Sequence, residues 1–146
     1  MAADRLIVSN TDRRGWEFLH ARSGLYWQDS FQSICREIDG QIVGAFGYTD
    51  YTGTSVQMHV AGATDTWLNR KLLWQAFAYP FLQLDCKVAI GVIAEGNDPA
   101  RQLAKKLGFG QFAIIPDAHP DGGLVITVMK RGDCRWLELS QRRFHG

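Results

Sequence analysis

Apolar residues along the chain recur at strand spacing in some stretches and at helix spacing in others. The clearest stretch spans residues 87–109, KVAIGVIAEGNDPARQLAKKLGF. Its first part, VAIGVIA, is an almost unbroken apolar run, which is typical of a strand covered on both faces. Asn97 or Asp98 can cap a helix that has Pro99 in its first turn and Gly108 at its end. The pattern predicts a strand, a turn and a helix of about ten residues.

The first half of the chain predicts a short strand, a helix and three antiparallel strands. RLIVS is a strand candidate, and residues 10–12, NTD, offer caps for a helix over RRGWEFLHAR. LYWQDSFQS follows no clean period and predicts either a second, short helix or an irregular loop. Asp39-Gly40 is a hairpin signal. Gly44 and Gly47 in the return strand indicate a bulge or a close approach of the backbone.

The second half predicts a further strand, two helices and a final hairpin. TSVQMHVAG alternates as the last of the three antiparallel strands, residues 64–83 carry apolar side chains at helix spacing, and VAIGVIA is the further strand. Asp65 or Thr66 is available as the cap of this helix, and Pro80 should kink or end it. QFAIIPD and LVITVMKR predict two strands joined at residues 121–123, and CRWLEL can pack back on the sheet. A helix between the fourth and fifth strands makes those two strands parallel neighbours.

Composition narrows the class of protein. The chain of 146 residues is long enough for one core, and 46% hydrophobic with 21% charged residues is typical of a globular domain. A formal net charge of +1 argues against a nucleic-acid or membrane surface. Cys35, Cys86 and Cys134 lack C-x-x-C spacing, so reduced thiols are expected rather than disulfides or zinc ligands, and no metal site is predicted. Without a signal-peptide core or a long apolar stretch, a cytoplasmic protein is expected.

Residues 97–109 resemble a known family. They match the signature N-x-x-A-x-x-L-x-x-K-L-G-F of the GNAT superfamily of acyl-CoA-dependent N-acyltransferases, through Asn97, Ala100, Leu103, Lys106, Leu107, Gly108 and Phe109. The order of strands and helices is also that of the GNAT fold. The resemblance implies a single α/β (α+β) domain over residues 1–146. Its mixed, mostly antiparallel sheet of about seven strands would be flanked by helices and splayed between strands 4 and 5.

Two other segments resemble a narrower group of proteins. WLNRKLLWQAFAYPFLQL and GDCRWLEL are similar to GNAT-like proteins carried by bacteriophages. This resemblance suggests a viral or prophage origin and names no substrate.

The family resemblance implies acetyl-CoA as the co-substrate. In GNAT enzymes the pantetheine lies between the splayed strands, whose edges here would be His59–Gly62 and Ile93–Glu95. The family's pyrophosphate loop, V-x-P-x-x-[QR]-G-x-G-[IY]-[GA], falls on residues 60–70, where its glycines are absent and Asp65 replaces a basic or amide residue. The residues expected to bind the cofactor are Val60, Ala61, Gly62, Thr66, Trp67, Leu68, Arg70, Lys71, Ile93, Asn97 and Ala100.

For catalysis, His59 is the first candidate for the general base, because an unperturbed pKa near ~6.5 suits proton transfer at neutral pH. Glu95 is the second, and a structural histidine held by hydrogen bonds is the alternative for His59. Many family members carry a tyrosine that protonates the departing thiolate, where this chain has Ala104. A thiol with a solution pKa near ~8.5 leaves with little help. A backbone amide near Val60 would polarise the thioester carbonyl.

The resemblance thus predicts direct transfer of an acetyl group from acetyl-CoA to the amine of an unidentified acceptor. The acceptor, a small molecule or a protein, is expected near Tyr26–Phe31 and Ala113–Gly123. The missing loop glycines, Asp65 and Ala104 support an alternative, a catalytically inactive GNAT-fold binding or assembly module. A nucleic-acid-modifying enzyme is a third reading, and a homodimer is left open.

Overall fold

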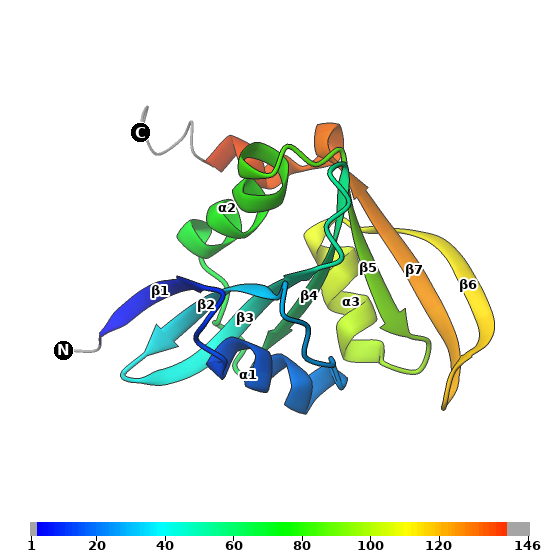
Figure 1. The fold of residues 1–146 in the computed structure, drawn as a ribbon, viewed down its shortest axis with the longest axis horizontal. Helices are drawn as coiled ribbons and strands as arrows, with labels where there is room; N and C mark the ends of the chain where they lie inside the picture. The colour runs from blue at the N-terminus through cyan, green and yellow to red at the C-terminus, as the bar shows by residue number, and fades with distance from the viewer. Residues whose placement is uncertain (1–2, 140–146) are drawn as a thin grey trace.

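A computed structural model describes residues 3–139, and its central element is one seven-stranded sheet (Figure 1). In space the strands follow the order β1-β2-β3-β4-β5-β7-β6. Every neighbouring pair is antiparallel except β4 and β5, which are parallel. The predicted sheet is confirmed. The strands are β1 (Asp4–Ser9), β2 (Gln32–Ile38), β3 (Gln41–Thr49), β4 (Ser55–Gly62), β5 (Val88–Ala94), β6 (Gly110–His119) and β7 (Gly122–Lys130).

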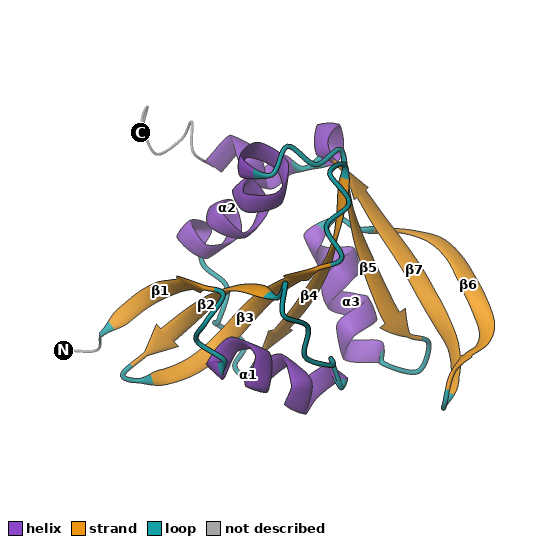
Figure 2. Ribbon diagram, in the orientation of Figure 1, coloured by secondary structure: helices purple, strands orange, loops and turns teal. Residues whose placement is uncertain are grey.

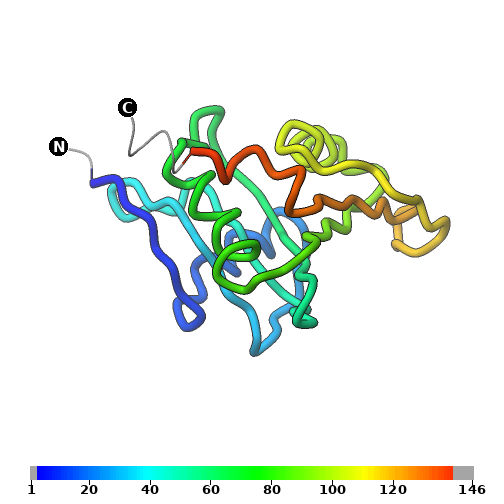
Figure 3. The backbone as a smooth tube through the Cα atoms, turned by 90° about the horizontal axis from the view of Figure 1, so that it is seen from above, coloured from blue at the N-terminus to red at the C-terminus, as the bar shows by residue number. Residues whose placement is uncertain are grey.

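Helices cover both faces of the sheet (Figure 2). On one face α1 (Arg14–Ser23) packs in a cluster built around Phe18, Leu19 and Phe31. On the other face α2 (Arg70–Ala78) and α3 (Asp98–Leu107) share the larger core. A π-helix (Tyr79–Gln83) continues α2, so the α-helix ends just before Pro80. This is expected because the proline ring cannot donate the helical hydrogen bond and clashes with the preceding turn. Figure 3 shows the same layers from above.

Two glycines of β3 are required by close packing on opposite faces. A Cβ on Gly44 would collide with the indole of Trp67. A Cβ on Gly47 would lie 2.6 Å from Leu19 Cδ1 and 2.7 Å from Phe31 Cε2. The register of β2 against β3 also shifts beside Gly44, between Arg36 and Glu37. Both the predicted bulge and the predicted close approach are confirmed.

The segment before α2 corrects two expectations from the sequence. The helix begins at Arg70, and the Asn69 side chain accepts the Leu72 amide hydrogen at 2.8 Å, so neither Asp65 nor Thr66 is its cap. Residues 63–69 form a loop instead, in which Arg36 donates to the carbonyls of Thr66 (2.8 Å) and Trp67 (2.9 Å), so these carbonyls find their partner outside a helix.

The segment between α1 and β2 also settles an open alternative. LYWQDSFQS contains no helix: it runs as a loop into β2, and its Phe31 side chain is buried under β3. Of the two structures that the sequence allowed for this segment, the irregular loop is the correct one.

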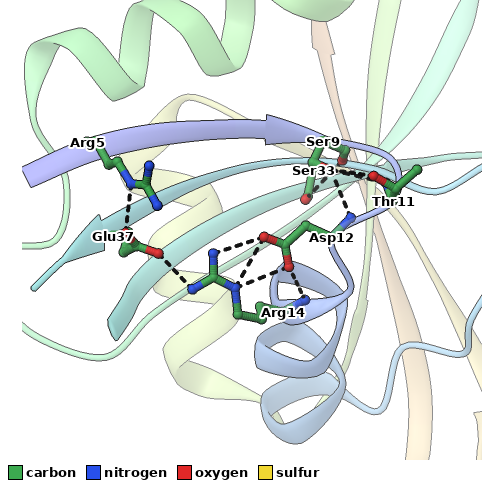
Figure 4. A network of polar contacts seen from close by, with 7 residues as sticks. All are labelled: Arg5, Ser9, Thr11, Asp12, Arg14, Ser33 and Glu37. Atoms are coloured by element: carbon green, nitrogen blue, oxygen red, sulfur yellow. Dashed lines mark hydrogen bonds and ion pairs between the residues drawn. The ribbon is translucent and has the colours of Figure 1, made fainter. Parts of the chain in front are cut away.

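A polar network joins β1, β2 and α1 (Figure 4). Glu37 is only 5% exposed, and its carboxylate accepts from Arg5 Nε and Arg14 Nη1, each at 2.7 Å. Arg14 also pairs with the Asp12 carboxylate at 2.9 Å. Hydrogen bonds from Arg5 and Arg14 lower the pKa of Glu37, and those from Arg14 lower the pKa of Asp12. The network therefore fixes the N-terminal strand and the start of α1 against β2.

The C-terminal tail packs back as predicted. Trp136 Nε1 donates to the Leu107 carbonyl at 2.7 Å, and Leu139 is buried. The basic residues at 141–143, for which the sequence favours a solvated tail, lie outside the described residues. Within residues 3–139 we find no helix with the length and apolar character needed to span a membrane.

Candidate functional site

Strands β4 and β5 run side by side for only part of their length. Three residue pairs join them, from Ser55–Val88 to Gln57–Ile90. Beyond that point β4 stays paired with β3 as far as Gly62, and β5 stays paired with β7 as far as Ala94. Each strand keeps its outer neighbour and loses its inner one, so the sheet opens in the middle. The predicted splay beside Val60 and Ile93 is confirmed.

The edge of β4 presents backbone groups to this opening. The bond from the Ala63 amide to the Val43 carbonyl (2.9 Å) flanks the Gly44–Gly62 pair, which is therefore a non-hydrogen-bonded pair of the β3–β4 ladder. Bonded and non-bonded pairs alternate along an antiparallel ladder. The N–H and C=O groups of Val60 and Gly62 consequently point away from β3, into the opening.

The edge of β5 does the same from the other side. The Glu95 amide donates to the Gly123 carbonyl at 2.9 Å and flanks the Ala94–Leu124 pair. By the same alternation, Val92 and Ala94 direct their backbone groups away from β7. Two strand edges with unpaired donors and acceptors thus face one another, which is the arrangement that an extended, amide-containing ligand can complete.

A cavity of about 180 Å³ occupies the opening, which we call the slot. Side chains alternate across the sheet, so the slot has two sides. The side toward α2 and α3 is mostly apolar and includes Met58, Val60, Ile93, Asn97, Ala100, Leu103, Ala104 and Phe109. The side toward α1 includes Ser23, His59, Val92, Ala94, His119 and Leu124. A ligand between the strands would be reached from both faces of the sheet.

Helix α3 forms one wall of the slot, and its start is fixed as predicted. The Asn97 side chain accepts the Ala100 amide hydrogen at 3.3 Å, Pro99 lies in the first turn, and Gly108 ends the helix in the left-handed region at φ 108°. This places Ala100 and Ala104 toward the slot, where their small side chains leave room between helix and strand. Ala104 stands where many GNAT enzymes have tyrosine.

His59 lies on the α1 side of the slot. Its Nε2 is 2.8 Å from Thr49 Oγ1, so the predicted alternative of a hydrogen-bonded histidine also describes it. Burial lowers its pKa to about 4, although the charge of Asp50 acts in the opposite direction. The imidazole is therefore neutral at pH 7, and one ring nitrogen is engaged by Thr49.

Glu95 does not line the slot. The exposed residue directs Oε1 toward the β6–β7 hairpin, where it would lie 2.9 Å from a Cβ on Gly123. Its carbonyl accepts from Arg101 Nη1 at 2.9 Å. The structure thus places the second predicted base at the rim, beside the hairpin.

The predicted cofactor residues fall into two groups. Val60, Ile93, Asn97 and Ala100 line the slot. The others run from the end of β4 through the connecting loop into the first turn of α2: Ala61, Gly62, Thr66, Trp67, Leu68, Arg70 and Lys71. Within this second group Arg70 and Lys71 are exposed in the first turn of α2, where cations and free amides suit a phosphate. Trp67 is turned inward, and its indole covers Gly62.

Several lining residues were absent from the sequence-based prediction. Leu124 and Thr127 reach the slot because β7, rather than β6, neighbours β5. Thr127 Oγ1 donates to the Gly91 carbonyl at 2.9 Å and packs where a Gly91 side chain would be. The sequence pattern predicted the β6–β7 hairpin but not which of its strands lies beside β5, so these contacts could be assigned only from the sheet order.

Comparison by sequence is uninformative: no protein-family model matches the chain, and no curated protein matches it significantly. Comparison by structure finds N-acetyltransferases. Mutant forms of the Vibrio cholerae spermidine/spermine N-acetyltransferase SpeG align over 95% of this chain and 98% of theirs, with a TM-score of 0.68 and 15% identity. The V. cholerae spermidine N-acetyltransferase in complex with CoA and spermine aligns over 88% of this chain and 96% of its own, with a TM-score of 0.66 and 13% identity.

A second organism supplies a similar structure. The yncA protein of Salmonella typhimurium, solved with its cofactor acetyl-CoA, covers 88% of this chain and 93% of its own, with a TM-score of 0.67 and 15% identity. Identities this low establish the fold and nothing finer. Together with the parallel, diverging β4 and β5, they show that this chain has the GNAT fold.

Proposed function

We propose that the protein is an N-acyltransferase that uses acetyl-CoA as its co-substrate and transfers the acetyl group directly to an amine. The observation that carries the proposal is the opening between β4 and β5, with unpaired backbone groups on both edges. Two of the similar structures are described with CoA or acetyl-CoA bound, which supports the choice of ligand.

In this proposal the protein acts mainly by positioning acetyl-CoA and stabilising the thioester oxygen. The backbone groups of Val60 and Val92 hold the pantetheine amides as an added strand would. The Val60 amide hydrogen donates to the thioester oxygen and stabilises the negative charge that develops there. The apolar wall from Ala100 to Ala104 excludes water from the thioester. Arg70 and Lys71 bind the phosphates in place of a glycine-rich loop.

Proton transfer falls to His59 because Glu95 lies outside the slot. A neutral imidazole has a free lone pair, and His59 accepts the proton that the amine loses once the new C–N bond has formed. A residue with a lowered pKa is a weak base, so most of the rate has to come from orientation and from the Val60 amide.

Calorimetric titration with acetyl-CoA tests the cofactor assignment. Wild type should bind with a micromolar Kd, and Ala104→Leu should weaken binding by roughly tenfold or more, because the added side chain occupies the slot. Lys106→Leu is the matched control, since Lys106 is exposed on the same helix and outside the slot lining. Equal binding by both variants would place the ligand elsewhere, and no binding by wild type would end the proposal.

One observation favours a second candidate, a GNAT-fold module without turnover. The buried Trp67 occupies the region next to Gly62, and the loop glycines of the family are missing. Binding of acetyl-CoA without any release of free thiol in the presence of amines would favour the module. A cytoplasmic location, a bacteriophage origin and a homodimer stay predictions from the sequence.

A further inference from the structure

The side of the slot that faces α1 is lined without charged residues. Its lining consists of Ser23, His59, Val92, Ala94, His119 and Leu124. The opposite side has no charged residue either, so no Asp, Glu, Lys or Arg among residues 3–139 lines the slot. Residues 1–2 and 140–146 contain no Asp or Glu. If the thioester lies in the slot, as the proposed function requires, an acceptor amine that reaches it there meets no carboxylate in the slot lining.

Several acidic residues lie on elements that border the slot, but none of them lines it. Asp50 is exposed at the end of β3, Glu95 leans on the β6–β7 hairpin, and Asp117 and Asp121 are exposed on that hairpin. His59 shows how burial affects a positive charge inside the slot. Its pKa falls to about 4 even with the charge of Asp50 acting to raise it, so a positive charge is disfavoured at this point of the slot.

An ammonium group in the slot would lose its hydration just as the protonated imidazole does, at a similar cost in free energy. A buried cation needs a paired anion, and an unpaired one costs far more than a neutral group of the same shape. An uncharged amine has no such cost, and apolar contacts with Val92, Ala94 and Leu124 would favour a flat or apolar body beside it.

We propose that the acceptor is a neutral, weakly basic amine of the arylamine class, rather than a polyamine or a lysine-like ammonium. This inference rests on the proposed function and specifies its substrate.

The chemical step balances with the groups present. The lone pair of the neutral amine forms the C–N bond at the thioester carbon, the C–S bond breaks, and its electron pair leaves with the CoA thiolate. The nitrogen then loses one proton to Nδ1 of His59, which carries the lone pair in the tautomer whose Nε2–H donates to Thr49 Oγ1. Because a neutral amine already has its lone pair, no base is needed before attack, which agrees with a weakly basic His59.

A matched pair of probes tests the inference. Aniline is uncharged at pH 7, whereas benzylamine has one more methylene and is cationic. With saturating acetyl-CoA and detection of the released thiol, kcat/KM for aniline should exceed that for benzylamine by roughly tenfold or more. Spermidine should be no better than benzylamine. A higher kcat/KM for benzylamine or spermidine than for aniline would overturn the inference.

Ser23 supplies the variant and its control. The residue is exposed at the end of α1 and lines the α1 side of the slot. Ser23→Asp would place a carboxylate there and should raise kcat/KM for benzylamine by roughly threefold or more, whereas the isosteric, neutral Ser23→Asn should leave the aniline preference unchanged. Equal effects of Asp and Asn would count against the electrostatic argument.

Calorimetry and the amine assay together distinguish a wrong acceptor class from a wrong proposed function. If acetyl-CoA binds and a cationic amine is the better acceptor, the acyltransferase proposal stands and the acceptor class is wrong. If acetyl-CoA binds and spermidine and benzylamine react while aniline does not, the same conclusion follows. If calorimetry shows no binding of acetyl-CoA, both fail together.

Discussion

Stability of the fold should depend on pH through His59, because the structure holds its imidazole neutral. Burial lowers the pKa from 6.5 to about 4. An unfolded chain exposes the ring and binds a proton near pH 6.5, while the folded chain does not. The stabilisation is therefore fully present above pH 6.5 and is lost as the pH falls toward 4.

The magnitude follows from the two pKa values. One pKa unit corresponds to about 1.4 kcal/mol, so the complete shift is worth about 3 kcal/mol. Between pH 7 and pH 4.5 most of this is lost, or roughly 2 kcal/mol, since at pH 4.5 the unfolded ring is protonated and the folded ring is mostly neutral. This is a large part of the stability of a typical domain.

Urea denaturation followed by tryptophan fluorescence at pH 7 and pH 4.5 measures the loss. Wild type should lose roughly 2 kcal/mol more than His59→Gln over this interval, because glutamine keeps a hydrogen-bonding group beside Thr49 and cannot titrate. The carboxylates contribute equally to both proteins and cancel. Equal losses in the two proteins, or an NMR titration of the His59 ring with a midpoint near pH 6.5, would refute the reasoning.

Three further outcomes are expected. Gly62→Ala should destabilise the protein by about 1–3 kcal/mol, since the added methyl group would collide with Trp67. Gly96→Ala is the control and should cost less, because the space around Gly96 is open. Thermal melts compare the two variants, and equal melting temperatures would contradict the packing argument. Asn69→Ala removes the α2 cap and should cost about 1 kcal/mol in urea denaturation, with an unchanged midpoint as the contrary result. Folding lowers the pKa of Glu37, so the stability that its carboxylate contributes is present above the pKa of the unfolded chain and is lost as the pH falls through the pKa of the folded chain. Glu37→Gln should therefore flatten the acidic side of a plot of unfolding free energy against pH. Plots of the same shape for both proteins would contradict this.

Local signals in the sequence placed α3 correctly and α2 incorrectly. Around α3, Asn97, Pro99 and Gly108 mark both ends, and nothing distant overrides them. Before α2, Asp65 is as good a cap by composition as Asn69. In the structure the helix begins after Asn69, and the carbonyl of Thr66 is bound by Arg36, 30 residues earlier. Composition does not choose between the two caps, and a contact at that sequence separation leaves no local pattern that predicts the start of α2.

In the candidate site, too, some features could be predicted from the sequence and others depend on contacts between distant residues. The edges of the slot were implied by the family resemblance once the strands were placed in order, so Val60 and Ile93 could be named before the structure was known. The neutral state of His59 depends on burial between α1 and the sheet, which a single sequence does not reveal. Glu95 was predicted as a base from its place after β5, yet the turn directs its carboxylate to the hairpin.

The short seam between β4 and β5 has a mechanical consequence. Strands β1–β4 form one leaf of the sheet and strands β5–β7 the other, and only three residue pairs tie the leaves together in the backbone ladder. A ligand bonded to both edges would add rungs where the ladder is missing. Binding of the ligand would then stiffen the sheet, and the bound molecule would stabilise the fold as well as react.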